Sequence, residues 1–246
     1  MKLRSLACGA IGVGSITAAV AAGVDTTDPT VIAAFQSGLT IQTFESLAGR
    51  TPQAITAYTQ GVPVSPNAFV FNQVPGVQFS VGGAVGTNMP ALYQLGGAIA
   101  GNAHSASTVL GPVDFDFTTK FGPGAFIEVF FPVKVSSVGF WLNPALGNAT
   151  LIAADTNFAF SGLPETTLET FAGATAGHFV GISRPTADIG GFKIIGTGTT
   201  GLTIDDFSYG VAGVTTPIPE PAEWALLLGG AAAMAAWRRR GTQRRA

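Results

Sequence analysis

Hydrophobic and polar residues alternate along most of this chain, in short runs separated by Gly, Pro, Asn and Asp. The clearest run is 135–142, in which Val138, Phe140 and Leu142 share one side and Trp141 falls on the other. Such alternation predicts half-buried β-strands. Further strands are predicted at 40–45, 55–60, 68–71, 77–81, 114–117, 125–131, 151–154, 157–160, 168–171, 178–182, 192–196 and 202–209.

One short helix is predicted at 30–37, because Asp28 can cap it, Pro29 suits its first turn and Gly38 can end it. No long amphipathic helix is present to cover a parallel sheet. Short strands at intervals of about 8–12 residues therefore predict an all-β, antiparallel sandwich or barrel. The glycine-rich stretch 82–112 is expected to form rim loops with a short strand near 92–95, and Pro132 is expected to interrupt a strand.

The two ends of the chain differ in residue pattern from the body between them, residues 23–212. Residues 1–22 are predicted to be a secretory signal peptide, with Lys2 and Arg4 before an apolar helix and a cleavage site after Ala21 or Ala22. Cys8 is the chain's single cysteine and lies in this leader, so the mature protein is expected to have no disulfide and no thiol nucleophile.

The C-terminus has three parts in order: Pro219-Glu220-Pro221, the uncharged apolar run 224–237, and a tail with Arg238, Arg239, Arg240, Arg244 and Arg245. A helix of that length spans roughly 21 Å, so it would cross a bilayer core only barely. The arginines would hold the C-terminus in the cytoplasm and leave the body outside. From this physics alone, a plain anchor and a processing signal are equally open.

The three parts together resemble the PEP-CTERM sorting signal of Gram-negative bacteria. The resemblance implies a linker at 213–218 and a sorting signal at 219–246. It also implies processing by an exosortase that recognises Pro219, Glu220 and Pro221, with Arg238, Arg239 and Arg240 anchoring the short transmembrane helix. The protein would be held briefly in the inner membrane and then displayed in the envelope or the exopolysaccharide matrix.

The body, 23–212, carries a second and looser resemblance. The runs 138–142, 179–182, 192–195 and 202–209 look like jelly-roll domains of secreted bacterial proteins. The run Ile204-Asp205-Asp206-Phe207 is also similar to the last strand of several carbohydrate-binding modules. This resemblance implies a jelly-roll sandwich.

Between leader and tail the chain has five basic and 12 acidic residues, a net charge of −7. That balance argues against nucleic acid as a partner. The negative net charge is compatible with binding of a cation. Because the first and last strands of a jelly roll are neighbours, Glu45, Asp205 and Asp206 are the candidate ligands for a structural Ca²⁺. The alternative is that strand alternation points the two aspartates to opposite faces, with one of them merely solvated or capping a turn.

Other candidate chemistry is weaker. Trp141 and Tyr93, and also Tyr58 and Tyr209, could stack on sugars or pack in the core. His104 beside Ser105, with His178 as the other histidine, makes no hydrolase motif. Asp114, Asp116 and Glu128 are candidates for the carboxylate pair of a glycosidase, or they belong to the solvated face of a sheet.

These observations favour a non-enzymatic envelope or biofilm-matrix protein with a structural or adhesive role. A carbohydrate-binding module with structural calcium is the first alternative, and a secreted hydrolase is the second.

Overall fold

The computed structural model describes most of the body in seven ranges: residues 22–58, 61–82, 89–113, 125–145, 148–156, 166–196 and 202–212. The predicted strands at 114–117 and 157–160, the leader up to residue 21, the linker and the sorting signal lie outside these ranges. No helix within the described ranges has the length and hydropathy needed to cross a bilayer.

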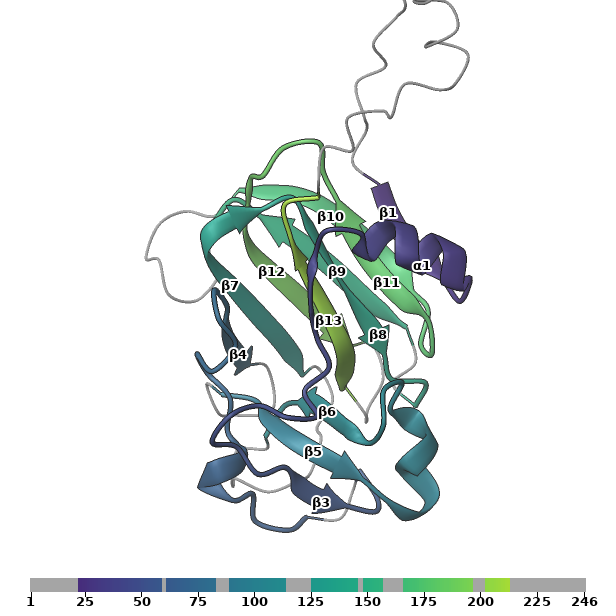
Figure 1. Ribbon diagram of the computed structural model, residues 1–246, viewed down its shortest axis with the longest axis vertical. Coiled ribbons are helices and arrows are strands. Elements are labelled where there is room, and N and C mark those ends of the chain that lie inside the picture. The colour runs from purple at the N-terminus through teal and green to yellow at the C-terminus, as the bar shows by residue number, and fades with distance from the viewer. Residues whose placement is uncertain are drawn as a thin grey trace, which may run out of the picture. The chain divides into compact units, whose positions relative to one another are not determined.

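The described chain folds mainly into two β-sheets that pack as a sandwich (Figure 1). The prediction of a β-sandwich is therefore confirmed, in a chain that is mostly β. The larger sheet has eight strands, in the order β1 (Ala22–Thr26), β11 (Phe179–Ser183), β8 (Ser137–Leu142), β13 (Ile204–Gly210), β6 (Thr108–Gly111), β5 (Ala91–Leu95) and β3 (Gln53–Ile55), with β2 (Thr40–Gln42) also paired to β13.

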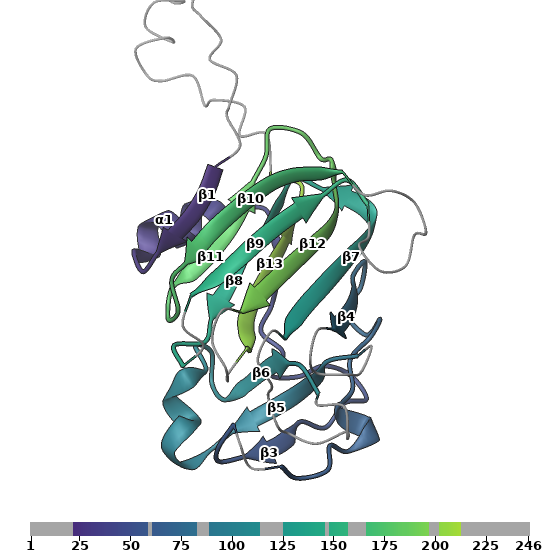
Figure 2. The same cartoon turned by 180° about the vertical axis from the view of Figure 1, so that it is seen from behind.

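The smaller sheet has five strands and forms the opposite layer, which faces the viewer in Figure 2. Its order is β10 (Thr167–Ala174), β9 (Ala149–Ala154), β12 (Ile189–Gly196), β7 (Phe126–Val135) and β4 (Gln78–Gly82). Its strands pair antiparallel throughout, whereas β3 and β5 of the larger sheet pair in parallel.

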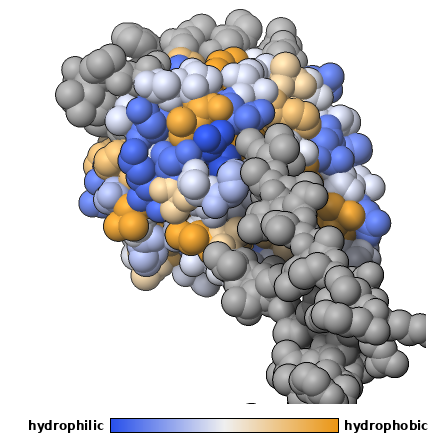
Figure 3. Space-filling model, turned by 90° about the horizontal axis from the view of Figure 1, so that it is seen from above, coloured by the Kyte–Doolittle hydropathy of each residue, from blue (hydrophilic) through white to orange (hydrophobic). Residues whose placement is uncertain are grey.

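The main core lies between the sheets. Val138, Phe140 and Leu142 of β8 point into it, as their alternation predicted, while Trp141 is only partly buried on the other side. A second cluster around Ile55, Tyr93 and Val109 fills the space beside β3, β5 and β6. On the face seen in Figure 3, hydrophobic residues lie in small separate groups among hydrophilic ones.

The helix α1 (Pro29–Gln36) forms where it was predicted. Asp28 caps it by accepting a hydrogen bond from the Thr30 amide at 2.8 Å, and Gly38 takes φ +77° just beyond its end. The Phe35 ring of α1 lies directly over two glycines, Gly139 of β8 and Gly181 of β11. The absence of side chains at these positions lets the helix dock close to the larger sheet.

The N-terminal strand β1 is held at its edge position by a polar cluster. Asp25 accepts hydrogen bonds from the amide and hydroxyl of Thr175 at 2.9 and 2.7 Å, and its other oxygen lies 2.6 Å from Nδ1 of His178. Burial alone would raise the pKa of Asp25, but the Thr175 and His178 hydrogen bonds outweigh it and leave that pKa below its usual value.

Several strand predictions were wrong in detail. β7 runs through Pro132, because the register with β12 shifts between Ile189 and Gly191 and so no regular ladder needs a proline amide there. Residues 68–71 form no strand: Phe69 makes only an isolated bridge to Ala91, after a 3₁₀ turn at Pro66–Ala68.

Two other predicted strands end earlier in the structure than the sequence pattern predicted. The strand predicted at 55–60 ends at Ile55 instead, and the strand predicted at 40–45 stops at Gln42, because Phe44 adopts φ +67°. The strands β1 and β6 were not predicted at all.

Replacing Gly181 with Ala tests the docking of α1. An ideal Cβ at this position would lie 2.7 Å from the Val138 carbonyl oxygen and 2.8 Å from the Phe35 ring. We expect the free energy of unfolding, measured by urea denaturation, to fall by about 1–3 kcal/mol because of overpacking. Gly101→Ala is the matched control, since a Cβ there meets nothing within 4 Å. Equal stabilities for the two variants would contradict this account.

Candidate functional site

Three carboxylates hold one segment of chain, residues 104–108. Asp205 of β13 accepts hydrogen bonds from the amides of His104 and Ser105 at 2.9 and 2.7 Å, and from the Ser105 hydroxyl at 2.9 Å. Glu45 accepts from the amides of residues 107 and 108 at 3.0 and 2.7 Å. Asp206 lies 2.5 Å from Nδ1 of His104. The segment is therefore fixed by side chains that come from residues distant in sequence.

Adjacent residues of a regular strand point to opposite faces, yet Asp205 and Asp206 both reach the same segment. The reason is a local irregularity in β13. The register between β13 and β8 shifts between Asp205 and Ser208, and Asp206 adopts φ +47°. This bulge turns the second aspartate toward His104.

Backbone strain concentrates at this place. In the described residues, three non-glycine residues have positive φ: Phe44 next to Glu45, Ala106 within the held segment, and Asp206 itself. Positive φ is uncommon for non-glycine residues, less so for Asp, and such a conformation persists where the surroundings impose it. The hydrogen bonds of the three carboxylates provide that constraint.

The electrostatics of Asp205 differ from those of a surface carboxylate. Its side chain is buried, and burial raises the pKa of Asp205 to about 6, with the nearby negative charge of Asp206 adding to the effect. The hydrogen bonds from Ser105 and the Asp206 amide act in the opposite direction. Asp205 is therefore a group that titrates near neutral pH.

The His104 imidazole is held flat against Trp141. The ring centroids are 3.7 Å apart and the planes differ by 10°. Because a carboxylate can only accept, Nδ1 of His104 donates to Asp206, and Nε2 is the ring nitrogen left for a ligand. The His104 side chain is 46% exposed. An exposed imidazole is thus fixed in orientation.

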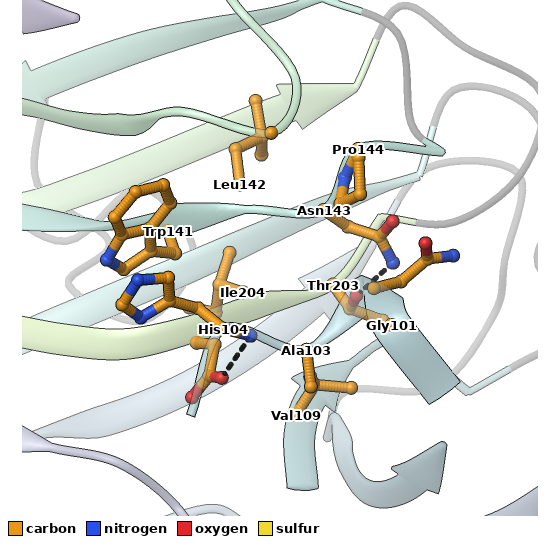
Figure 4. A pocket seen from close by; sticks show the side chains of 13 residues that line it. Gly101, Ala103, His104, Val109, Trp141, Leu142, Asn143, Pro144, Thr203 and Ile204 are labelled. Carbon is orange, nitrogen blue, oxygen red and sulfur yellow. Dashed lines mark hydrogen bonds between the residues drawn. The ribbon is translucent and has the colours of Figure 1, made fainter. Parts of the chain in front are cut away.

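The stacked pair separates two hollows. The first, of about 150 Å³, is lined by residues that include Asn102, His104, Trp141, Asn143, Thr203 and Asp205. Figure 4 shows Trp141 and His104 stacked at one side of this hollow, with Asn143 and Thr203 at the other. The second hollow, of about 330 Å³, lies against α1 and shares His104 and Trp141 as a wall.

A buried polar network supports the first hollow. The Asn143 side-chain amide donates to the Thr203 hydroxyl at 2.6 Å and to the hydroxyl of Tyr58. Asn102 donates to the same Tyr58 oxygen at 3.1 Å. Burial raises the pKa of Tyr58. The network fixes the amide groups of this wall in place.

The predicted calcium ligands are all described, but they do not gather around one point. No group of three or more His, Cys, Asp and Glu residues within the described ranges is placed to hold a metal ion. Glu45 follows β2, and Asp205 and Asp206 lie in β13, which pairs with β2. Their oxygens accept hydrogen bonds from residues 104–108 and do not form the expected calcium cluster. Both aspartates are buried, so neither is merely solvated.

The aromatic candidates have different environments. Tyr93 is completely buried and donates its hydroxyl to the Pro112 carbonyl at 2.6 Å, so it is not a sugar platform. Tyr58 and Tyr209 are buried as well. Trp141 does line both hollows, but His104 covers one of its faces.

Ser105 and Glu128, two candidates for hydrolase chemistry, each contact another side chain of the protein. Ser105 donates its hydroxyl to Asp205 and not to His104, so the two neighbours do not act as nucleophile and base. Glu128 is buried, 3.1 Å from Nζ of Lys193. Asp114, Asp116 and the sorting residues Pro219, Glu220, Pro221, Arg238, Arg239 and Arg240 lie outside the described residues.

A scan against protein-family models gives no match, and a search of curated proteins finds no similar sequence. Sequence reasoning had singled out the three carboxylates, His104 and Trp141, but not their mutual contacts. His104 and Asp206 are 102 positions apart, so no local pattern indicates that they meet.

The raised pKa of Asp205 predicts an unusual pH dependence of stability. Its value is about 6 in the folded chain and about 3.9 in the unfolded chain. The folded state therefore binds the proton more tightly, so the contribution of Asp205 is complete below pH 4 and is lost as pH rises through 6. We expect Asp205→Asn to abolish this trend, which amounts to about 3 kcal/mol in the free energy of unfolding between pH 4 and pH 8.

The measurement is urea denaturation at both pH values, with Asp188→Asn as the control. Hydrogen bonds from Arg184 lower the pKa of Asp188, so removing that carboxyl should change the pH dependence in the opposite sense. If Asp205→Asn and the parent show the same pH trend, the assigned environment of Asp205 is wrong.

Proposed function

We propose that this protein is an exported envelope or matrix protein of a Gram-negative bacterium, handed to an exosortase by its C-terminal segment. The observation that carries the proposal is the order of three parts at residues 219–246: the Pro219-Glu220-Pro221 motif, a short apolar run and an arginine cluster. The leader at 1–22 supports export. The membrane holds the precursor only until the motif is recognised.

For the body we propose a non-catalytic, structural or adhesive role. The titratable groups of the candidate site make hydrogen bonds within the protein: His104 with Asp206, and Asp205 with Ser105. This arrangement stabilises a segment and does not present a nucleophile with its base. Its expected partner is exopolysaccharide.

We also propose that the sandwich is a jelly roll. In support, β7, β8 and β9 lie in alternating sheets, and so do β10, β11, β12 and β13. The resemblance of residues 138–209 to secreted jelly-roll domains agrees with this arrangement.

The sorting proposal is tested by replacing Pro219, Glu220 and Pro221 together with alanine, in a host that has an exosortase. We expect most of the variant to remain as full-length precursor in the inner membrane, because the processing enzyme no longer recognises it. Immunoblots of membrane, surface and medium fractions measure this. Alanine replacement of 214–216, in the linker, is the matched control and should be processed like the parent. Normal processing and display of the first variant would refute the proposal.

A further inference from the structure

The two hollows beside the His104–Trp141 stack have the geometry of adjoining subsites. They share one wall, and neither is large: about 150 and 330 Å³. Pockets for drug-sized ligands usually range from about 300 to 1,000 Å³. The first hollow is smaller than this range and suits a single small ring, and the second lies at the lower end of the range. One linear ligand could occupy both by passing over the wall.

The charged residues that line the two hollows indicate which ligand charge is favoured. None of the described residues that line either hollow is Lys or Arg, whereas Asp205 lines the first and Asp206 the second. An anionic ligand would have no cation to pair with and would be repelled by the aspartates. A neutral ligand is favoured.

The polar groups of the lining indicate hydroxyl groups on the ligand. Asn102 lines the first hollow and Gln36 the second; their side-chain NH₂ groups donate to Tyr58 and Ser208, and their amide oxygens can accept from ligand hydroxyls. The buried Asn143 amide makes its hydrogen bonds within the protein and supports this wall. His104 stands between the two hollows with Nε2 as its remaining ring nitrogen. Apolar surface from Pro144 on one side and Ile32 on the other completes the lining. Amide, imidazole and apolar surfaces in combination match a sugar ring, which has hydroxyl edges and apolar C–H faces.

The strain around the wall supports a binding role. Phe44, Ala106 and Asp206 have positive φ, and each lies within the segment 104–108, or at or beside a residue that holds it. Strained residues of this kind cluster at sites where side chains must be held in advance of binding. Here the constraint fixes the His104 ring before any ligand arrives.

We propose that this pair of hollows is a binding site for a neutral polysaccharide, with successive sugar residues on either side of the His104–Trp141 wall. The inference rests on the proposed function for the presence of polysaccharide around the protein, but the binding itself does not depend on sorting. It gives the body a specific role as an anchor in the matrix.

The test is affinity electrophoresis of the full chain, purified in a zwitterionic detergent that contains no sugar. Native gels contain dextran, laminarin or galactomannan as neutral polymers, or alginate or polygalacturonate as anionic ones. We expect retardation by at least one neutral polymer and none by the anionic ones. Retardation by the anionic polymers alone, or by none of the five, would overturn the proposal.

Two pairs of variants locate the site. Ala33→Phe fills the second hollow, while Ala34→Phe adds the same ring next to it, and both alanines are exposed on α1. Gly101→Phe fills the first hollow from a position with open space around its Cβ, and Ala100→Phe is its control. We expect each filling variant to weaken binding at least tenfold and each control to bind like the parent.

Thermal unfolding of all four variants checks that the fold is kept. Equal binding by the filling and control variants would show that the polysaccharide binds elsewhere. Because this experiment uses purified protein, its failure is distinct from a failure of the sorting proposal, which is measured by processing in cells.

Discussion

The strand β13 and its two aspartates are the constraint on which the rest of this structure depends. β13 pairs with β8, β6 and β2 within the larger sheet. Where Asp205 and Asp206 interrupt its regular register, their carboxylates bind the segment that leads into β6. Removing a buried acceptor of this kind leaves several amide donors without partners, which is far more destabilising than the loss of a surface contact. Glu45 holds the far end of the same segment.

This constraint explains how a chain with few charged residues builds a polar site on an apolar sandwich. The core between the sheets is made of aliphatic and aromatic side chains, and it determines where β8 and β13 lie. Trp141 is the residue of β8 that points away from this core, and the held segment brings His104 onto its ring. The packing of the two sheets therefore places Trp141, and the carboxylate hydrogen bonds then place His104 against it. The stack and the hollows beside it depend on both.

The same arrangement connects the body to its proposed place in the cell. An anchoring protein in a polysaccharide matrix needs no turnover, but it does need a rigid surface that is complementary to a repeating ligand. A site held by buried hydrogen bonds satisfies that need, because little conformational entropy is left to lose when the ligand binds. The leader and the sorting segment would bring this surface to the place where such ligands occur.

The sequence by itself determined the elements whose cause is local. Alternation predicted the β-sandwich and the inward side of β8, and the Asp28–Pro29 pair predicted α1, because caps and strand periodicity depend on near neighbours. Only the tertiary structure decided the continuation of β7 through Pro132, the strands β1 and β6, and the burial of Tyr93. It also decided the use of Glu45, Asp205 and Asp206. Strand periodicity would place the two aspartates on opposite faces. A bulge and a contact across 102 positions bring both to His104. No local pattern in the sequence encodes the bulge or the contact.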